Sequence, residues 1–120
     1  MRILHASFLV SSLEASHRFY GELLGLEVDM ARPDPGFPGL WYHLESGQQI
    51  HLLQMHNPDR EKVHPEHGGR DRHVAFSVND LGEIMSRLDQ ARIPYTMSRS
   101  GRRAFFCRDP DGNALEFIES

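Results

Sequence analysis

The sequence predicts an α+β fold made of two βαβββ modules, each with a curled mixed sheet. The order of one strand, one helix and three strands occurs twice along the 120 residues. His5 and His73, in the two opening strands, are 68 residues apart, and so are Leu13 and Leu81, which open the two helices. A chain of this length can form one domain or two small packed modules, but not two independent domains.

In the first module, residues 3–10 are mostly apolar and predict a strand. A helix follows, since apolar side chains recur at helical spacing from Leu13 to Leu24 and Gly25 then ends it. Ser11 and Glu14 resemble a capping box at its start. Three further strands are predicted, at residues 26–31, 40–44 and 49–55.

The second module repeats this pattern, beginning with a predicted strand at residues 72–78. The next apolar residues match the i, i+3, i+4, i+7 spacing of a helix, namely Leu81, Ile84, Met85 and Leu88. Asp109, Pro110, Asp111 and Gly112 fit a type I turn. The remaining strands are predicted at residues 93–97, 104–107 and 114–118.

Between the modules, which span residues 1–56 and 72–120, lies a polar loop at 57–71 that is rich in Pro, Gly, His and charge. We interpret it as a linker or as a loop over the site. Each module alone would leave one sheet face uncovered, so we expect two modules to close around a shared cleft. Spacing along the chain leaves open whether they meet within one chain or across a dimer.

The composition excludes several classes of partner. A net charge of −4 provides no broad basic face for nucleic acid. The apolar runs are only as long as strands, and residues 1–10 lack a secretory pattern, so we expect neither a membrane span nor export. The single cysteine, Cys107, cannot form an internal disulfide, which fits a reducing compartment. We therefore expect a cytoplasmic protein.

Four residues at matched positions carry the candidate chemistry. His5 and His73 lie in the first strand of each module, and His51 and Glu116 lie among apolar residues in the last strand. One histidine in a strand is usually an ordinary core or surface residue, but four matched polar residues are harder to explain in that way. Since side chains alternate across a strand, Glu116 points away from its apolar neighbours, and into the cleft if the sheet curls that way. A carboxylate placed there needs a partner, and a bound cation is the strongest one. His5, His73 and Glu116 would form a two-histidine, one-carboxylate metal site with open positions.

Three stretches of sequence resemble the glyoxalase, bleomycin-resistance and extradiol dioxygenase superfamily, also called the vicinal oxygen chelate superfamily. They are the opening HASFLV at residues 5–10, the helix SHRFY at 16–20 followed by LGL at 24–26, and the ending DPDGNALEF at 109–117. The resemblance covers nearly the whole chain. It implies paired βαβββ modules, a homodimer whose sites each combine one module from either chain, and one divalent metal ion per site.

The resemblance places the metal ligands at His5, His73 and Glu116, with His51 at a fourth position that is more often Glu or Gln. The ion could be nickel, zinc, manganese, cobalt or iron. Small bacterial glyoxalase I is the most similar member in length and opening, but the residues that would contact glutathione differ here. Leu9 stands in place of an arginine, and Met55 in place of an asparagine.

A metal site with imidazole in place of a carboxylate has one negative charge fewer, which favours an anionic ligand. Arg99, Arg102 and Arg103, in the hairpin before the last strands, are candidates to bind that anion, although such a run is more often a solvated turn. The loop histidines His56, His64 and His67 could line an entrance, but we expect them to be solvated. His17 and His43 receive no role.

The expected function is a metal-dependent glyoxalase-like lyase or isomerase acting on a small, oxygen-chelating metabolite. In this hypothesis His51 or Glu116 removes a carbon-bound proton, and the metal stabilises the enediolate. One alternative is a thiol transferase like those of fosfomycin resistance, or a binding protein that sequesters a drug. A third possibility is an iron(II) dioxygenase of the extradiol type.

Overall fold

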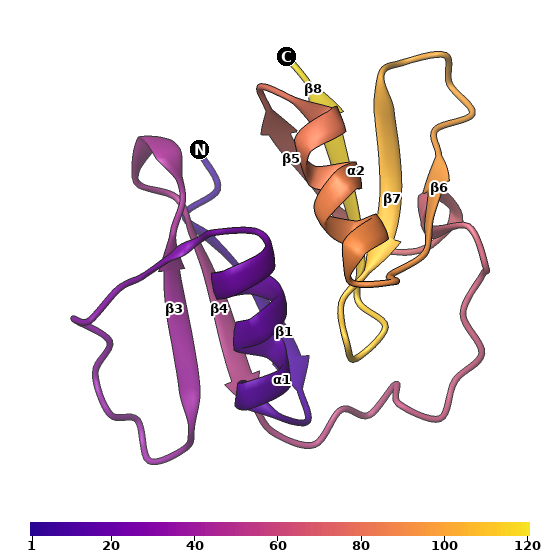
Figure 1. The fold of residues 1–120 in the computed structure, drawn as a ribbon. Helices are drawn as coiled ribbons and strands as arrows, with labels where there is room; N and C mark the ends of the chain where they lie inside the picture. The colour runs from indigo at the N-terminus through magenta and orange to yellow at the C-terminus, as the bar shows by residue number, and fades with distance from the viewer. The chain divides into compact units, whose positions relative to one another are not determined.

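The computed structural model describes residues 1–120 and divides them into two compact units, Met1–Glu61 and Lys62–Ser120. Each unit holds one four-stranded mixed sheet and follows the βαβββ order (Figure 1). The predicted α+β fold is therefore confirmed. None of the helices has the length and apolar character needed to span a membrane.

The first unit contains β1 (His5–Val10), β2 (Glu27–Val28), β3 (Gly39–His43) and β4 (Gln49–Gln54). Between β1 and β2 the chain forms the helix α1 (Leu13–His17), which continues as a π-helix at Arg18–Leu23. The strand order is β1-β4-β3-β2, with β1 parallel to β4 and the other neighbours antiparallel.

The second unit contains β5 (His73–Val78), α2 (Leu81–Gln90), β6 (Tyr95–Met97), β7 (Ala104–Arg108) and β8 (Ala114–Glu119). The strand order is β5-β8-β7-β6, and β5 is parallel to β8. This topology is the same as that of the first unit, as the sequence repeat predicts.

The pairing register makes the two units equivalent at the level of single residues. Ser7 of β1 pairs with His51, and Ala75 of β5 pairs with Glu116. Ser7 lies two residues after His5, and Ala75 lies two residues after His73. His51 and Glu116 thus occupy corresponding places in their sheets.

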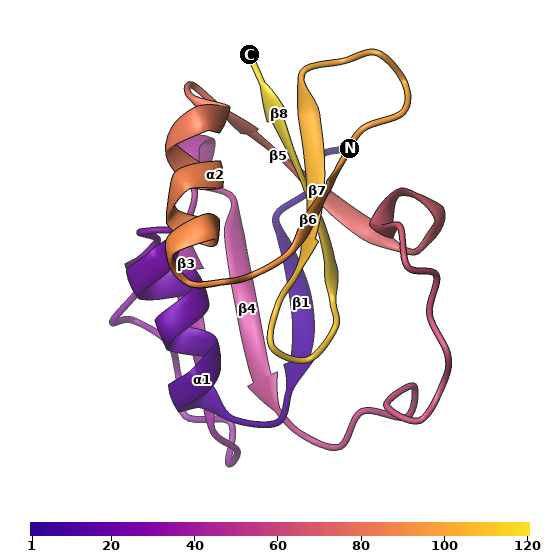
Figure 2. The same ribbon diagram turned by 45° about the vertical axis from the view of Figure 1, so that its right-hand side comes forward.

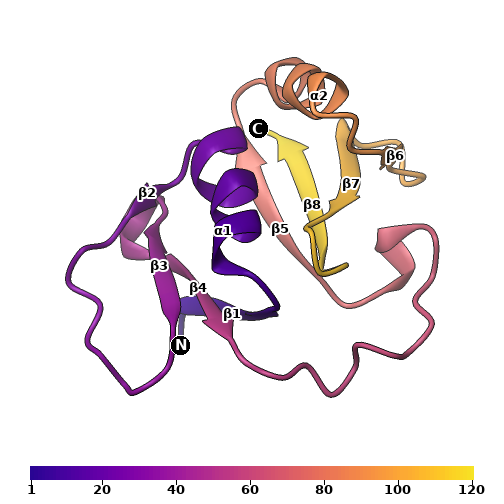
Figure 3. The ribbon, with the colours of Figure 1, turned by 60° about the horizontal axis from the view of Figure 1, so that its bottom comes forward.

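In each unit the helix lies over one face of the sheet, and that face holds the apolar core. Figure 2 shows α1 on one side of its sheet, and Figure 3 shows α2 beside β7 and β8. The first core contains the fully buried residues Val10, Tyr20, Tyr42, Ile50 and Leu52, and the second contains Leu88, Phe105 and Leu115. Because side chains alternate along a strand, the candidate ligands lie on the opposite face of each sheet.

The start of the first helix corrects one prediction. Ser12, with an extended backbone, is the N-cap, and its side chain accepts a hydrogen bond of 3.2 Å from the Ala15 amide. The predicted capping box of Ser11 and Glu14 is therefore wrong, since the N-cap is one residue later than predicted and the helix begins at Leu13.

The predicted second strand, residues 26–31, is also too long. Only Glu27–Val28 is a strand, and it pairs with the end of β3. The Asp29 side chain accepts a hydrogen bond of 2.9 Å from the Ala31 amide, which turns the chain immediately after the strand.

The predicted turn at residues 109–112 is confirmed, and its geometry explains the residue types. The Gly112 amide donates to the Asp109 carbonyl at 3.0 Å, and Gly112 has a φ of 83°, which glycine adopts without strain. The buried Asp109 carboxylate accepts hydrogen bonds of 2.9 Å from the amides of Asp111 and Asn113. The side chain therefore stabilises the loop that leads into β8.

Candidate functional site

In the first unit, the two candidate histidines lie on adjacent strands with their rings stacked. The ring centroids of His5 and His51 are 4.0 Å apart, and the planes differ by 15°. The indole of Trp41 also stacks on His51, at 4.1 Å and 4°. Although it lies on the polar face of the sheet, the His51 residue is only 8% exposed.

A hydrogen-bonded chain leads from His51 to a carboxylate. His51 Nε2 lies 2.9 Å from Gln49 Oε1, and Gln49 Nε2 donates to Asp29 Oδ2 at 2.7 Å. The backbone amide of Ala31 and then the Gln49 side chain lower the pKa of Asp29, and they outweigh the opposing effect of burial. Asp29 is therefore an ionised acceptor at neutral pH.

The surroundings of His51 favour its neutral form. Burial lowers the pKa of His51, and its electrostatic interactions with His5 and Arg32 lower it further, against the opposing effect of Asp29. A neutral imidazole carries one N–H and one lone pair, so it can accept a proton or bind a metal ion.

In the second unit, His73 and Glu116 face each other across neighbouring strands. His73 Nδ1 donates to the backbone carbonyl of Asp71 at 2.8 Å, and His73 Nε2 lies 3.4 Å from Glu116 Oε2. The Glu116 residue is 3% exposed, and its other oxygen accepts a hydrogen bond of 3.2 Å from Arg102. This pair therefore combines a buried carboxylate with a histidine whose ring orientation is fixed by the hydrogen bond from Nδ1 to the Asp71 carbonyl.

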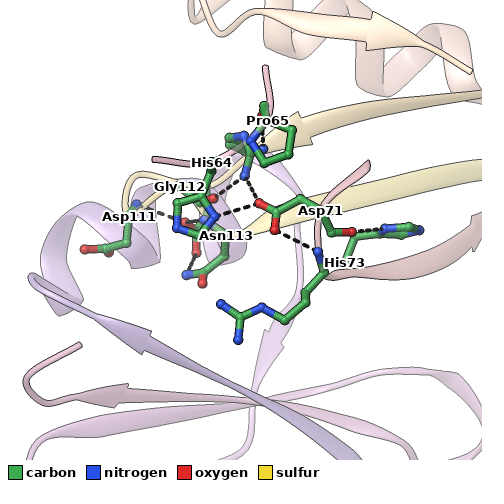
Figure 4. A network of polar contacts seen from close by, with 10 residues as sticks. His64, Pro65, Asp71, His73, Asp111, Gly112 and Asn113 are labelled. Carbon is green, nitrogen blue, oxygen red and sulfur yellow. Dashed lines mark hydrogen bonds and ion pairs between the residues drawn. The ribbon is translucent and has the colours of Figure 1, made fainter. Parts of the chain in front are cut away.

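A polar network supports this pair from the connecting loop. Arg108 donates to the Asp71 carboxylate at 2.8 Å and to the carbonyl of Gly112 at 2.7 Å, and it also donates to the carbonyl of Pro65. Figure 4 shows Asp71 between His64, which contacts its carboxylate at 2.9 Å, and His73. Burial alone would raise the pKa of Asp71, but its hydrogen bonds, chiefly that from Arg108, lower it.

The three candidate arginines do not form one group. Only Arg102 contacts Glu116, and Arg99 is exposed in the hairpin. Arg103 instead pairs with Glu119, whose Oε1 accepts the amide of Leu81 at the start of α2. The structure therefore leaves Arg102 as the arginine beside the candidate ligand.

Of the other histidines, His56 is exposed in the connecting loop, as expected, and four have polar partners: His17, His43, His64 and His67. His67 is only 9% exposed and its Nδ1 lies 2.7 Å from the Thr96 hydroxyl, so the expectation that it is solvated is wrong. Its ring also packs edge-on against Phe106, which is why a polar loop residue is buried. His17 Nδ1 lies 2.8 Å from the Tyr42 hydroxyl, and burial raises the pKa of Tyr42 to about 12. His43 Nε2 lies 3.6 Å from Asp29 Oδ1.

The sequence interpretation missed four residues around His51: Trp41, Gln49, Asp29 and Arg32. Strand alternation could have found Gln49, which lies two residues before His51 and on the same face. Trp41 pairs with His51 across two strands, so its position depends on the register. Arg32 comes from a loop, where it donates to the Phe37 carbonyl at 3.0 Å and lies over Gly39, and no periodic pattern predicts that placement.

Within this structure, no group of three or more His, Cys, Asp or Glu side chains is arranged to hold a metal ion. The pair of His73 and Glu116 does fit one, because the Nδ1–H bond of His73 leaves Nε2 facing the carboxylate. His5 and His51 do not fit as a pair, since a ligated ion lies in the plane of each imidazole and their stacked planes do not meet nearby.

Comparisons with known proteins agree with this architecture. The family model described as the Glyoxalase/Bleomycin resistance protein/Dioxygenase superfamily matches residues 2–117. A lactoylglutathione lyase of Haemophilus influenzae is 28% identical, over 100% of this chain and 93% of that protein. Glutathione transferase FosA of Serratia marcescens is 31% identical, over 93% of this chain and 76% of that protein. A crystal structure assigned to the glyoxalase family, from Bacillus anthracis, has 26% identity and a TM-score of 0.74, covering 100% of this chain and 95% of that chain.

Proposed function

The chain belongs to the glyoxalase, bleomycin-resistance and dioxygenase superfamily, and from this premise we propose that it is a divalent-metal-dependent enzyme of the glyoxalase-like lyase or isomerase type. The proposed substrate is a small, oxygen-chelating, anionic metabolite. The observation that carries the proposal is the pair formed by His73 and Glu116.

The geometry of this pair calls for a cation. Because a carbonyl oxygen can only accept, the Asp71 carbonyl fixes the His73 proton on Nδ1. In the neutral ring, Nε2 is then an acceptor, and it faces a carboxylate oxygen, also an acceptor, at 3.4 Å. A divalent ion bound by both groups would relieve this repulsion, and the backbone bond to Nδ1 is the support that metal-ligating histidines usually have.

We propose that His5 joins His73 and Glu116 as the third ligand, and that His51 is either a fourth ligand or the base. The ligands then come from both units. We further propose that the protein is a homodimer and that each site combines ligands from two chains. The expected content is one divalent ion per site, with nickel, zinc, manganese, cobalt or iron as candidates.

A bound divalent ion would supply Lewis-acid polarisation of the substrate oxygens. The protein would supply the proton acceptor, His51 or Glu116, for a carbon-bound proton. Arg102 would bind an anionic group, since its guanidinium already contacts a carboxylate and its side chain is 58% exposed.

Glutathione hemithioacetal should be a poor substrate. Leu9 and Met55 stand in place of the polar residues that glyoxalase I would offer to glutathione, and Met55 is 48% exposed without a charged group to offer. Losing two charge-assisted hydrogen bonds of about 1.5–3 kcal/mol each lowers affinity by two or more orders of magnitude. The test is turnover of methylglyoxal plus glutathione with nickel, cobalt, manganese and zinc in turn.

We expect a kcat/KM well below about 10⁴ M⁻¹s⁻¹ with every metal. A value at or above that level would make the protein a glutathione-dependent glyoxalase and would contradict the proposed substrate class. The same preparations, loaded with iron(II) and supplied with small catechols in an oxygen electrode, test the dioxygenase alternative. The similarity to FosA makes thiol addition to fosfomycin the third assay.

A further inference from the structure

We infer that His51 is not a metal ligand but the proton-accepting group of the site, which it serves through Nδ1, and that Gln49 and Asp29 are positioning residues that fix its tautomer. This inference rests on the proposed function, because it assigns a role within that site. Two independent observations support it: the stacking of the His51 ring and the hydrogen bond at its Nε2.

The stacking shows why His51 is poorly placed as a ligand alongside His5. An ion bound to an imidazole lies in the ring plane, about 2.0–2.1 Å from the nitrogen. The rings of His5 and His51 lie face to face, 4.0 Å apart at 15°, so their planes do not meet within bonding distance of both rings. One ring would have to turn out of the stack, and His51 is held on its other face by Trp41 at 4.1 Å. His5, whose ring has no such second stacking partner, is the one that can turn.

The hydrogen bonds then fix which nitrogen of His51 carries the proton. Asp29 is ionised and only accepts, so the amide nitrogen of Gln49 must face it, at 2.7 Å. The amide oxygen of Gln49 therefore faces His51 Nε2, at 2.9 Å. Because that oxygen only accepts, Nε2 carries the hydrogen, and the lone pair of the neutral ring is at Nδ1.

His51 and His73 thus present opposite ring nitrogens. The Asp71 carbonyl holds the proton of His73 on Nδ1 and leaves Nε2 for an ion, whereas Gln49 holds the proton of His51 on Nε2 and leaves Nδ1 as the acceptor. The backbone fixes the first arrangement, and a side chain pair fixes the second. Only the second can therefore be removed by substitution without changing the backbone.

In the proposed reaction His51 accepts a proton from a carbon atom of the substrate. A C–H bond next to a substrate carbonyl breaks, its proton forms a bond to His51 Nδ1, and the electron pair stays on the substrate, delocalised onto its own carbonyl oxygen. His51 becomes an imidazolium that still donates from Nε2 to Gln49, with the negative charge of Asp29 at the end of the chain. Where the deprotonated carbon carries a hydroxyl, return of the proton from Nδ1 to the former carbonyl carbon, together with transfer of the hydroxyl proton to the former carbonyl oxygen, completes an isomerisation.

The first test is the ¹⁵N spectrum of the histidine rings in the metal-free and zinc-loaded protein. We expect His51 to show an N–H at Nε2 and a pyridine-type nitrogen at Nδ1 in both states, while the Nε2 signal of His73 shifts on loading. A hydrogen at Nδ1 of His51 in the metal-free protein, or a zinc-dependent shift at either of its nitrogens equal to that of His73, would overturn the inference.

Substitutions at Gln49 test the positioning role. Gln49→Leu removes the acceptor and should give a mixture of His51 tautomers with a lower kcat, whereas Gln49→Glu combined with Asp29→Asn keeps an acceptor facing His51 and a donor facing it from position 29, and should restore the Nε2–H tautomer. If Gln49→Leu leaves the tautomer unchanged, neither Gln49 nor Asp29 sets it, and the positioning role is wrong.

Zinc titration separates the two roles of the histidines. His51→Phe keeps an aromatic ring between Trp41 and His5, and we expect it to bind zinc within about threefold of the unchanged protein while losing turnover. We expect His73→Ala to weaken zinc binding by about 100-fold or more, since even supporting groups of metal ligands are worth about 10–100-fold. Equal losses in the two variants would show that His51 is a ligand. If the unchanged protein binds no divalent ion, the proposed function fails, and the spectrum of the metal-free protein still decides the tautomer.

Discussion

At the scale of single residues, the chemistry around His51 depends on partners that are far apart in the sequence. The predicted strands placed His51 correctly in the last strand of its module, but the sequence interpretation did not use alternation to find Gln49 on the same face. The stack with Trp41 could not be predicted, because it requires the register between β3 and β4. Arg32 reaches the same face from a loop, and its position depends on the space left by Gly39.

Gly39→Ala should therefore destabilise the protein. An ideal Cβ at this position would lie 2.5 Å from the carbonyl oxygen of Leu52 and 2.5 Å from the guanidinium of Arg32. The arginine can move, but the carbonyl belongs to the neighbouring strand and cannot move without disturbing the sheet. We expect a loss of about 1–3 kcal/mol in the free energy of unfolding, measured with urea.

Gly82→Ala is the matched control for this substitution. Gly82 lies in α2, where an added Cβ would lie 3.2 Å from the Asp80 side chain, and alanine is favoured over glycine in a helix by up to about 1 kcal/mol. The control should be neutral or stabilising. Equal stability of the Gly39→Ala variant and the unchanged protein would show that the strand accommodates a side chain there.

At the scale of elements, the predicted strands and helices were correct in type and order. Boundaries differed where a local hydrogen bond competed with the pattern, as at Asp29 after β2 and at Ser12 before α1. The loop at residues 57–71 has no apolar period, so its burial could not be predicted. His67 is buried through its contacts with Thr96 and Phe106, which come from β6 and β7.

Arg108→Met should detach this loop from the second unit. The Arg108 side chain is 24% exposed and donates hydrogen bonds to Asp71, Gly112 and Pro65. We expect a loss of about 1.5–3 kcal/mol in the free energy of unfolding, together with faster proteolysis between residues 62 and 71. The matched control is Arg18→Met, whose exposed pair with Glu14 should be worth no more than about 0.5 kcal/mol.

The destabilisation caused by Arg108→Met should depend on pH. Since the pKa of Asp71 is lowered from 3.8 in the folded protein, its contribution to stability is present above the unfolded value and is lost as the pH falls through the lowered value. The difference between the Arg108→Met variant and the unchanged protein should therefore shrink in strong acid. A difference that stays constant from neutral pH to strong acid would rule out the ion pair as its cause.

At the scale of the whole molecule, the sequence repeat predicted more of the fold than any single motif did. The equal spacing of the two histidines and the two leucines predicted two units of the same topology, and the pairing registers agree with it. The way in which two modules assemble could not be predicted, because the polar connector contains no pattern that ties one module to the other. The proposed dimer therefore rests on the family resemblance and not on any spacing in the sequence.

The proposed homodimer predicts a molar mass of about twice the 13.8 kDa of one chain. Multi-angle light scattering at micromolar concentration, with and without added zinc, measures it directly. Sites that combine ligands from two chains should also make the dimer more stable when the ion is bound, because an ion that binds only the assembled form favours it by mass action. A monomer that still binds the ion would refute the shared site.

Metal analysis of the purified protein tests whether His73 and Glu116 hold a divalent ion. The unchanged protein, dialysed against nickel, zinc, manganese, cobalt or iron(II) and freed of unbound ions, should retain about one ion per chain with at least one of these metals, since each chain supplies one ligand set. His73→Ala should retain much less, while His17→Ala, whose ring contacts the Tyr42 hydroxyl instead, should retain as much as the unchanged protein. Retention by His73→Ala at the level of the unchanged protein would show that His73 is not a ligand.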